Sequence, residues 1–276
     1  MSVPDSTSFH RGYAPVNGLE MYYEVHGAGK PLVLLHGGGS TINTTFGKII
    51  PLLARNHQVI AVELQAHGRT SDRDAELSFE QDAADVAGLL RVLKIEKADF
   101  LGFSNGGTTL IHLALEYPDL VDKIILASAL AKRSGVPAFF WDFMEQAKLE
   151  NMPPQLKEAF LAVNPDPKAL EIMHDKDARR MREFRDIPDD RLRSIKGPVL
   201  IVIGDRDIIT PEHALELHRL LANSSLAIIP GQHGEYLGEI TTLDENYSDE
   251  YLIVPIIEKF LNRSWQTSSL LPIRPV

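Results

Sequence analysis

Cysteine is absent from the 276 residues of this chain. The absence excludes disulfide bonds, zinc–thiolate sites, iron–sulfur clusters and a cysteine nucleophile. It leaves the redox compartment undetermined, because a chain without thiols is stable in oxidising and in reducing surroundings.

Long apolar runs are missing as well. None approaches the roughly 18 residues that indicate a membrane-spanning helix, and the start of the chain has neither the basic nor the apolar region of a signal peptide. We therefore expect a cytoplasmic protein with no membrane partner. Basic residues number 28 against 38 acidic ones, and the net charge of −10 argues against nucleic acid as the main partner.

Two cofactor signatures are also lacking. The sequence contains no HExxH motif, and no dinucleotide-binding G-x-G-x-x-G follows an early strand. We expect neither a metal nor another cofactor. The composition that remains, 44% hydrophobic and 24% charged residues, is that of an ordinary globular protein with a well-buried core.

Strand-like and helix-like segments alternate along most of the chain. The first two strands flank Asn17-Gly18, a dipeptide that favours a tight hairpin because both positions need a positive φ. Most later strands are short, continuously apolar runs, which is typical of parallel strands covered on both faces. Repeated strand–helix units predict an α/β fold with a mostly parallel central sheet and flanking helices. The predicted strands are residues 9–16, 19–26, 31–35, 58–64, 98–103, 123–128, 199–204 and 226–229.

The strand pattern disappears between residues 130 and 193, where two or three helical segments are expected. We interpret residues 131–193 as a helical cap inserted into one core. That core comprises residues 1–130 and 194–263, and residues 264–276 form a C-terminal tail.

An aromatic cluster lies in the predicted cap. Phe139, Trp141 and Phe143 are the residues that we expect to bind substrate, because a cap covers the carboxyl ends of the strands. Packing in a core is the alternative for the same residues.

The strongest motif is Gly102-Phe103-Ser104-Asn105-Gly106. It satisfies G-x-S-x-G, follows a predicted strand and precedes a predicted helix, which is the context of a nucleophile elbow. Small residues two before and two after the serine avoid steric collision in such a cramped turn. We predict that Ser104 is a nucleophile; a helix-capping serine in a glycine-rich turn is the alternative.

A serine hydroxyl needs a base, and the base needs an orienting acid. His233 follows the last predicted strand, and both Asp205 and Asp207 follow the strand at residues 199–204. We assign His233 as the base and Asp207 as the acid. Asp205 is interpreted as a turn or ion-pair residue beside Arg206.

Acyl transfer also needs donors for an oxyanion. We predict the backbone N–H groups of Asn105 and Gly38, with Gly39 as the alternative to Gly38. His36 begins the same glycine-rich loop and is interpreted as a structural residue.

Five segments together resemble the α/β-hydrolase superfamily, in the branch of capped esterases, perhydrolases and carbon–carbon bond hydrolases. They are residues 34–39 (LLHGGG), 63–70 (ELQAHGRT), 102–107 (GFSNGG), 195–211 (IKGPVLIVIGDRDIITP) and 230–234 (PGQHG). The resemblance implies the α/β-hydrolase fold with an inserted helical cap. The family pattern G-x-x-D-x-x-x-P places Gly204 and Pro211 around Asp207, which favours it over Asp205. Residues 63–70 depart from the common D-x-P-G-H-G-x-S form, so this segment does not indicate a subfamily.

These residues predict a serine hydrolase that cleaves a carboxylic ester of a small to medium apolar substrate. Three alternatives stay open: carbon–carbon bond hydrolysis with the same triad, peracid formation, and a small-molecule receptor with little turnover. The expected partner is a small-molecule substrate, and the sequence does not indicate an oligomeric state.

Overall fold

A computed structural model describes residues 9–243, 251 and 253–265 of the chain. Most of the predicted C-terminal tail therefore lies outside the described residues. None of the described helices is both long and apolar enough to cross a membrane.

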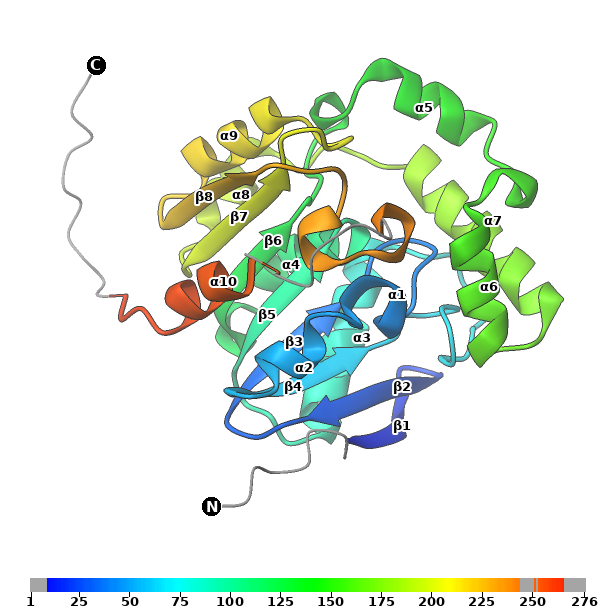
Figure 1. Cartoon of the computed structure of the whole chain (residues 1–276), viewed down its shortest axis with the longest axis horizontal. Helices are drawn as coiled ribbons and strands as arrows, with labels where there is room; N and C mark the ends of the chain where they lie inside the picture. Colours follow the sequence, from blue (N-terminus) through cyan, green and yellow to red (C-terminus); the bar gives the residue numbers. More distant parts are fainter. Residues whose placement is uncertain (1–8, 244–250, 252, 266–276) are drawn as a thin grey trace.

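An eight-stranded sheet forms the centre of the molecule, in the order β1-β2-β4-β3-β5-β6-β7-β8 (Figure 1). The hairpin strand β2 runs antiparallel to β1 and to β4, and all other neighbours are parallel. The predicted mostly parallel sheet is confirmed, and every predicted strand end lies within two residues of the observed one. The strands are β1 (His10–Val16), β2 (Leu19–His26), β3 (Lys30–Leu35), β4 (His57–Val62), β5 (Ala98–Phe103), β6 (Val121–Ala127), β7 (Val199–Gly204) and β8 (Ser224–Ile229).

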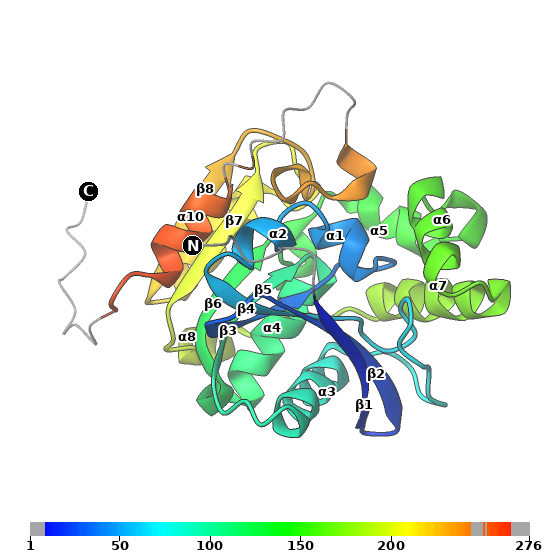
Figure 2. The ribbon, with the colours of Figure 1, turned by 60° about the horizontal axis from the view of Figure 1, so that its bottom comes forward.

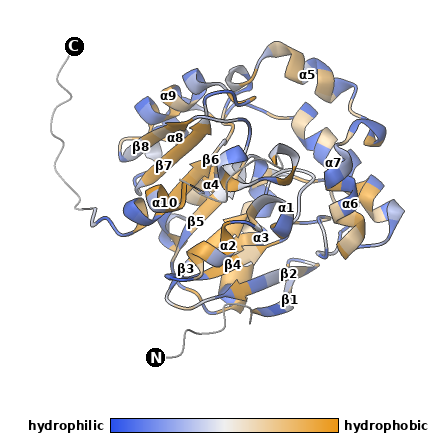
Figure 3. Ribbon diagram, in the orientation of Figure 1, coloured by the Kyte–Doolittle hydropathy of each residue, from blue (hydrophilic) through white to orange (hydrophobic). Residues whose placement is uncertain are grey.

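Helices cover both faces of the sheet, as Figure 2 shows. On one face α1 (Ile42–Phe46), α2 (Ile50–Leu53) and α10 (Ile253–Leu261) bury their apolar side chains. On the other lie α3 (Phe79–Val92), α4 (Asn105–Glu116), α8 (Asp189–Ser194) and α9 (Pro211–Leu220). Two apolar cores explain why β5 and β7 are buried at every position and why β7 is a continuous apolar run (Figure 3).

The segment between β6 and β7 is helical, but it holds four α-helices where two or three helical segments were expected. It contains α5 (Ala138–Glu145), α6 (Pro154–Val163), α7 (Pro167–Arg182) and α8. Helices α6 and α7 share a small apolar cluster of their own, which includes the fully buried Phe160 and Met173. In contrast, α8 packs against α4 and α9 of the core. We call residues 131–193 the insert and use the name unchanged below.

Short 3-10 turns complete the described chain. They lie at Pro118–Leu120, Arg133–Gly135, Leu149–Asn151, Glu235–Leu237 and Ile240–Thr242.

Candidate active site

Ser104 stands on a sharp turn between β5 and α4. Its backbone has φ 52° and ψ −119°, a strained conformation for a residue with a side chain. A Cβ on Gly102 would lie 2.4 Å from the Gly106 carbonyl oxygen, and one on Gly106 would lie 2.2 Å from the Leu35 carbonyl oxygen. The turn therefore requires glycine at both flanking positions, as the elbow motif predicts.

His233 and Asp207 meet beyond the carboxyl ends of β8 and β7. The Nδ1 atom of His233 lies 2.6 Å from Oδ1 of Asp207. The side chain of Asp205 forms no hydrogen bond with His233 in the described part of the chain. It accepts a hydrogen bond from the Gly231 N–H at 2.8 Å and so supports the loop that carries His233. The structure thus brings Asp207, and not Asp205, to the histidine.

Two further residues, which the sequence did not reveal, form a chain of hydrogen bonds to Asp207: Ser128 contacts its carboxylate, and Tyr236 contacts Ser128. Ser128 directly follows β6, and its Oγ lies 2.5 Å from Oδ2 of Asp207 and 2.7 Å from the hydroxyl of Tyr236. Burial would raise the pKa of Asp207, but the electrostatic interaction with His233 and the hydrogen bonds from His233, Ser128 and the Ile209 N–H hold that pKa below its usual range. Because an ionised carboxylate only accepts, Ser128 donates to Asp207. Burial raises the pKa of Tyr236 well above its usual value, so its phenol keeps the proton that it donates to Ser128.

The glycine-rich loop after β3 lies beside the start of α4. A Cβ on Gly38 would lie 2.5 Å from the side-chain nitrogen of Asn105, so the loop and the helix are in close contact. Neither the Gly38 N–H nor the Asn105 N–H donates a hydrogen bond to a described residue, whereas the Gly39 N–H donates to Asp177 of α7 at 2.6 Å. The two predicted oxyanion donors are therefore free, and the alternative donor at Gly39 is occupied.

His36 lies beneath this loop and is completely buried. Its Nε2 accepts the Leu64 N–H at 3.1 Å, so its Nδ1 carries the proton that bonds the Gly37 carbonyl oxygen at 2.7 Å. Burial lowers the pKa of His36 to about 3, which keeps the ring neutral. The bond to Leu64 ties the loop to the segment after β4, and the bond to Gly37 fixes the loop itself, in agreement with a structural role.

These groups stand side by side because neighbouring parallel strands end at the same edge of the sheet. Along the order β3-β5-β6-β7-β8, the residues after the strand ends are Gly38, Ser104, Ser128, Asp207 and His233. Among the described residues no hydrogen bond joins Ser104 to His233, and such contacts are often long in ligand-free active sites.

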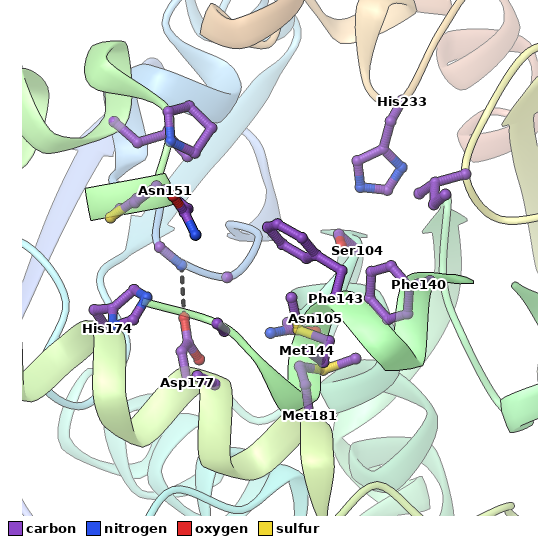
Figure 4. A pocket seen from close by; sticks show the side chains of 18 of the residues that line it. Ser104, Asn105, Phe140, Phe143, Met144, Asn151, His174, Asp177, Met181 and His233 are labelled. Atoms are coloured by element: carbon purple, nitrogen blue, oxygen red, sulfur yellow. Dashed lines mark hydrogen bonds between the residues drawn. The ribbon is translucent and has the colours of Figure 1, made fainter. Parts of the chain in front are cut away.

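Ser104 and His233 face one cavity of about 240 Å³ between the sheet edge and the insert (Figure 4). Phe140, Phe143 and Met144 of α5 line it, so Phe143 lies where we expected. Further apolar lining comes from Leu130, Val136, Ala147, Met152, Pro153, Leu156, Met173, Ala178, Met181, Ile208 and Ile209.

Two expected substrate-binding residues do not line the cavity. Phe139 is 63% exposed on the outer side of α5. Trp141 donates from Nε1 to the Arg133 carbonyl oxygen at 2.9 Å and packs against Phe184 with ring centres 5.9 Å apart. The expectation is corrected for this pair, because aromatic residues on every side of α5 cannot all face the cavity.

No group of three or more metal-ligating side chains occurs in residues 9–243, 251 and 253–265. The described arrangement brings His233 and Asp207 together beside a cavity that Ser104 also lines, with the unbonded N–H groups of Gly38 and Asn105 next to it.

Comparison with known proteins places this geometry in context. The human serine hydrolase BPHL is 29% identical over 245 residues, which cover 84% of this chain and 82% of that protein. A 2-hydroxy-6-oxo-2,4-heptadienoate hydrolase of Pseudomonas putida is 25% identical and covers 80% of this chain and 87% of its own length. The structure of 2-hydroxy-6-oxo-6-phenylhexa-2,4-dienoate hydrolase from Rhodococcus matches with a TM-score of 0.76 at 22% identity, over 93% of this chain and 99% of that one.

The same architecture recurs in a serine hydrolase of carbazole degradation, with a TM-score of 0.76 at 20% identity over 92% of this chain and 99% of that one. The family profile described as alpha/beta hydrolase fold matches residues 30–175, which is more than half of the chain. The match spans β3, the elbow at Ser104 and most of the insert. This chain belongs to the α/β hydrolase fold family.

Proposed function

We propose that the protein hydrolyses carboxylic esters of small to medium apolar compounds through an acyl-enzyme. The observation that carries the proposal is the contact of 2.6 Å between His233 and Asp207, next to a cavity that both Ser104 and His233 line. A base oriented by a buried, ionised carboxylate is what a serine hydroxyl needs to become a nucleophile.

In the first step the Oγ of Ser104 attacks the ester carbonyl while Nε2 of His233 accepts its proton. Asp207 holds the Nδ1–H of the ring and stabilises the imidazolium that forms. The N–H groups of Gly38 and Asn105 donate to the oxyanion. His233 then protonates the leaving alcohol, and the acyl group stays on Ser104.

In the second step His233 removes a proton from water, and the resulting hydroxide attacks the acyl carbon. Collapse of the second oxyanion breaks the bond to Ser104, which recovers its proton from His233. The products are a carboxylic acid and the free enzyme.

The lining of the cavity indicates the substrate class. Apolar side chains dominate it, and Lys148 is the single lysine or arginine among its described lining residues. Burial of an apolar acyl or alcohol group contributes about 25 cal/mol for each Å² removed from water. We propose that the insert acts as a cap, with Phe140, Phe143 and Met144 as the wall that contacts this group.

Carbon–carbon bond hydrolysis is the second candidate, because one relative and one similar structure are named as dienoate hydrolases. Their named compounds carry a carboxylate. The scarcity of cationic side chains around the cavity favours a neutral ester over such an anion.

A direct test treats the purified protein with a fluorophosphonate probe and follows p-nitrophenyl esters of graded acyl length beside a dienoate. We expect one adduct by intact-mass spectrometry, its loss in Ser104→Ala, and faster turnover of the esters. Preferred turnover of the dienoate would replace the ester proposal with the second candidate. An adduct that persists in Ser104→Ala would overturn the role of Ser104.

A further inference from the structure

One carboxylate of the insert reaches the loop that supplies an oxyanion donor. Asp177, on α7, accepts the Gly39 N–H at 2.6 Å through Oδ2, and the same oxygen lies 2.9 Å from Nε2 of His67. The dashed line in Figure 4 marks the first of these contacts. A helix that follows the elbow by some sixty residues in sequence thus holds the backbone next to Gly38.

The carboxylate is buried but not isolated. Asp177 is 8% exposed, and its Oδ1 binds the guanidinium of Arg180, which is 5% exposed and also binds Asp82 at 2.6 Å. Despite burial, the charges of Arg180 and His67 and the bonds from His67 and Gly39 hold the pKa of Asp177 far below its usual range. Burial would lower the pKa of His67, but the charge of Asp177 and the hydrogen bond to it raise that pKa above its usual value. The ionised carboxylate is therefore a permanent acceptor for the loop.

We propose that Asp177 is a positioning residue, which makes correct docking of the cap a condition for a formed oxyanion hole. The inference rests on the proposed function. By occupying the Gly39 N–H, Asp177 fixes the orientation of this part of the loop and leaves the Gly38 N–H as the free donor. If the cap moved away, the Gly39 N–H would lose its short contact with Asp177 and keep only the longer one of 3.3 Å to Nε2 of His67, and the loop would lose its tie to α7.

The same helix offers a matched control. Lys176 precedes Asp177 and anchors α7 to the core through Asp72, at 2.7 and 2.8 Å, and through the carbonyl oxygens of Arg73 and Ala75, at 2.9 and 2.8 Å. It has no hydrogen bond to the loop among the described residues. Lys176→Met therefore removes a separate contact of α7 with the core and leaves the contact between Asp177 and Gly39 in place.

The experiment compares Asp177→Ala, Asp177→Asn and Lys176→Met with the wild type, using the best p-nitrophenyl ester. We expect kcat to fall roughly 100-fold in Asp177→Ala, within the range for loss of one oxyanion donor. Asp177→Asn keeps an acceptor oxygen for the Gly39 N–H, so its kcat should fall less, by roughly 10-fold. KM should change less than about threefold in both, and Lys176→Met should keep kcat within about threefold while its melting temperature falls.

A second readout needs no turnover. Amide hydrogen exchange of Gly39, followed by NMR after selective ¹⁵N-glycine labelling, should be slow in the wild type and Lys176→Met and fast in Asp177→Ala. Fast exchange in the wild type would overturn the proposal even if the Asp177 variants fail to fold. Equal kcat in Asp177→Ala and Lys176→Met would overturn it too. A wild type without esterase activity but with a protected Gly39 would instead mark a failure of the proposed function.

Discussion

Ser128 offers the sharpest test of how the acid is held in place. Its hydroxyl is the one described donor to Oδ2 of Asp207, while Oδ1 receives both His233 and the Ile209 N–H. In Ser128→Ala the carboxylate keeps its charge and its contact with His233, but one oxygen loses its partner. The Tyr236 hydroxyl then keeps only the Val202 carbonyl oxygen, at 3.3 Å, as an acceptor among the described residues.

The magnitude follows from the kind of hydrogen bond that is removed. A bond to a charged acceptor contributes about 1.5–3 kcal/mol. For a chain of this size the melting temperature should fall by roughly 3–12 °C. If the same contribution is lost from the transition state, where the imidazolium depends on Asp207, kcat should fall roughly 10- to 100-fold.

The stability difference between wild type and Ser128→Ala should depend on pH in a definite direction. The folded-state pKa of Asp207 lies below the ordinary 3.8, so the ionised carboxylate stabilises the fold above that pH and the contribution is lost as the pH falls through the folded pKa. Removing Ser128 raises that folded pKa. The difference in stability between wild type and Ser128→Ala should therefore be full at neutral pH and shrink below about pH 4.

The assay combines urea unfolding at several pH values with ester kinetics. Thr109→Val is the matched control, because Thr109 is completely buried and its hydroxyl has no partner among the described residues. A drop in kcat no larger than that of Thr109→Val would refute the idea that Ser128 orients the acid. A stability difference that grows on acidification would refute the assigned donor direction.

Three other expectations concern the acid, the cavity wall and the elbow. Asp207→Asn should lower kcat by about 10⁴-fold with the fold intact, as in a well-studied triad, and Asp205→Asn far less; kinetics and circular dichroism check both. Phe143→Ala should change kcat/KM unevenly across esters of different acyl length, by tens of fold at most, because burial of one methylene contributes about 1–3 kcal/mol. Trp141→Ala should instead lower the melting temperature and leave the dependence of kcat/KM on acyl length unchanged. Gly106→Ala places a methyl group 2.2 Å from a backbone oxygen of β3, so thermal denaturation and the yield of folded protein should show a severe loss of stability.

Much of the sheet could be predicted because its signals are local. Asn17 and Gly18 do adopt positive φ, 47° and 85°, at the hairpin. Continuous apolar runs marked the parallel strands, and the spacing of small residues marked the turn at Ser104. His233 and Asp207 could be identified from the sequence because loops after parallel strands converge at one edge of the sheet.

The residues that the sequence did not reveal act across long distances in the chain. Asp177 lies 110 residues from His67, and no local pattern marks it within the charged run of α7. Ser128 ends a predicted strand, yet its role depends on Asp207, 79 residues away. Trp141 shows a different limit. In a helix with aromatic residues on every side, periodicity does not tell which ring faces the cavity and which packs against other residues of the insert.

The backbone of Ser104 has a consequence for how this protein can evolve. Its φ of 52° is a conformation that glycine adopts freely and that costs other residues about 1–3 kcal/mol. Selection for thermal resistance alone would therefore favour glycine at position 104 and would remove the hydroxyl of the proposed nucleophile. A search for more stable variants therefore has to screen for activity in every round.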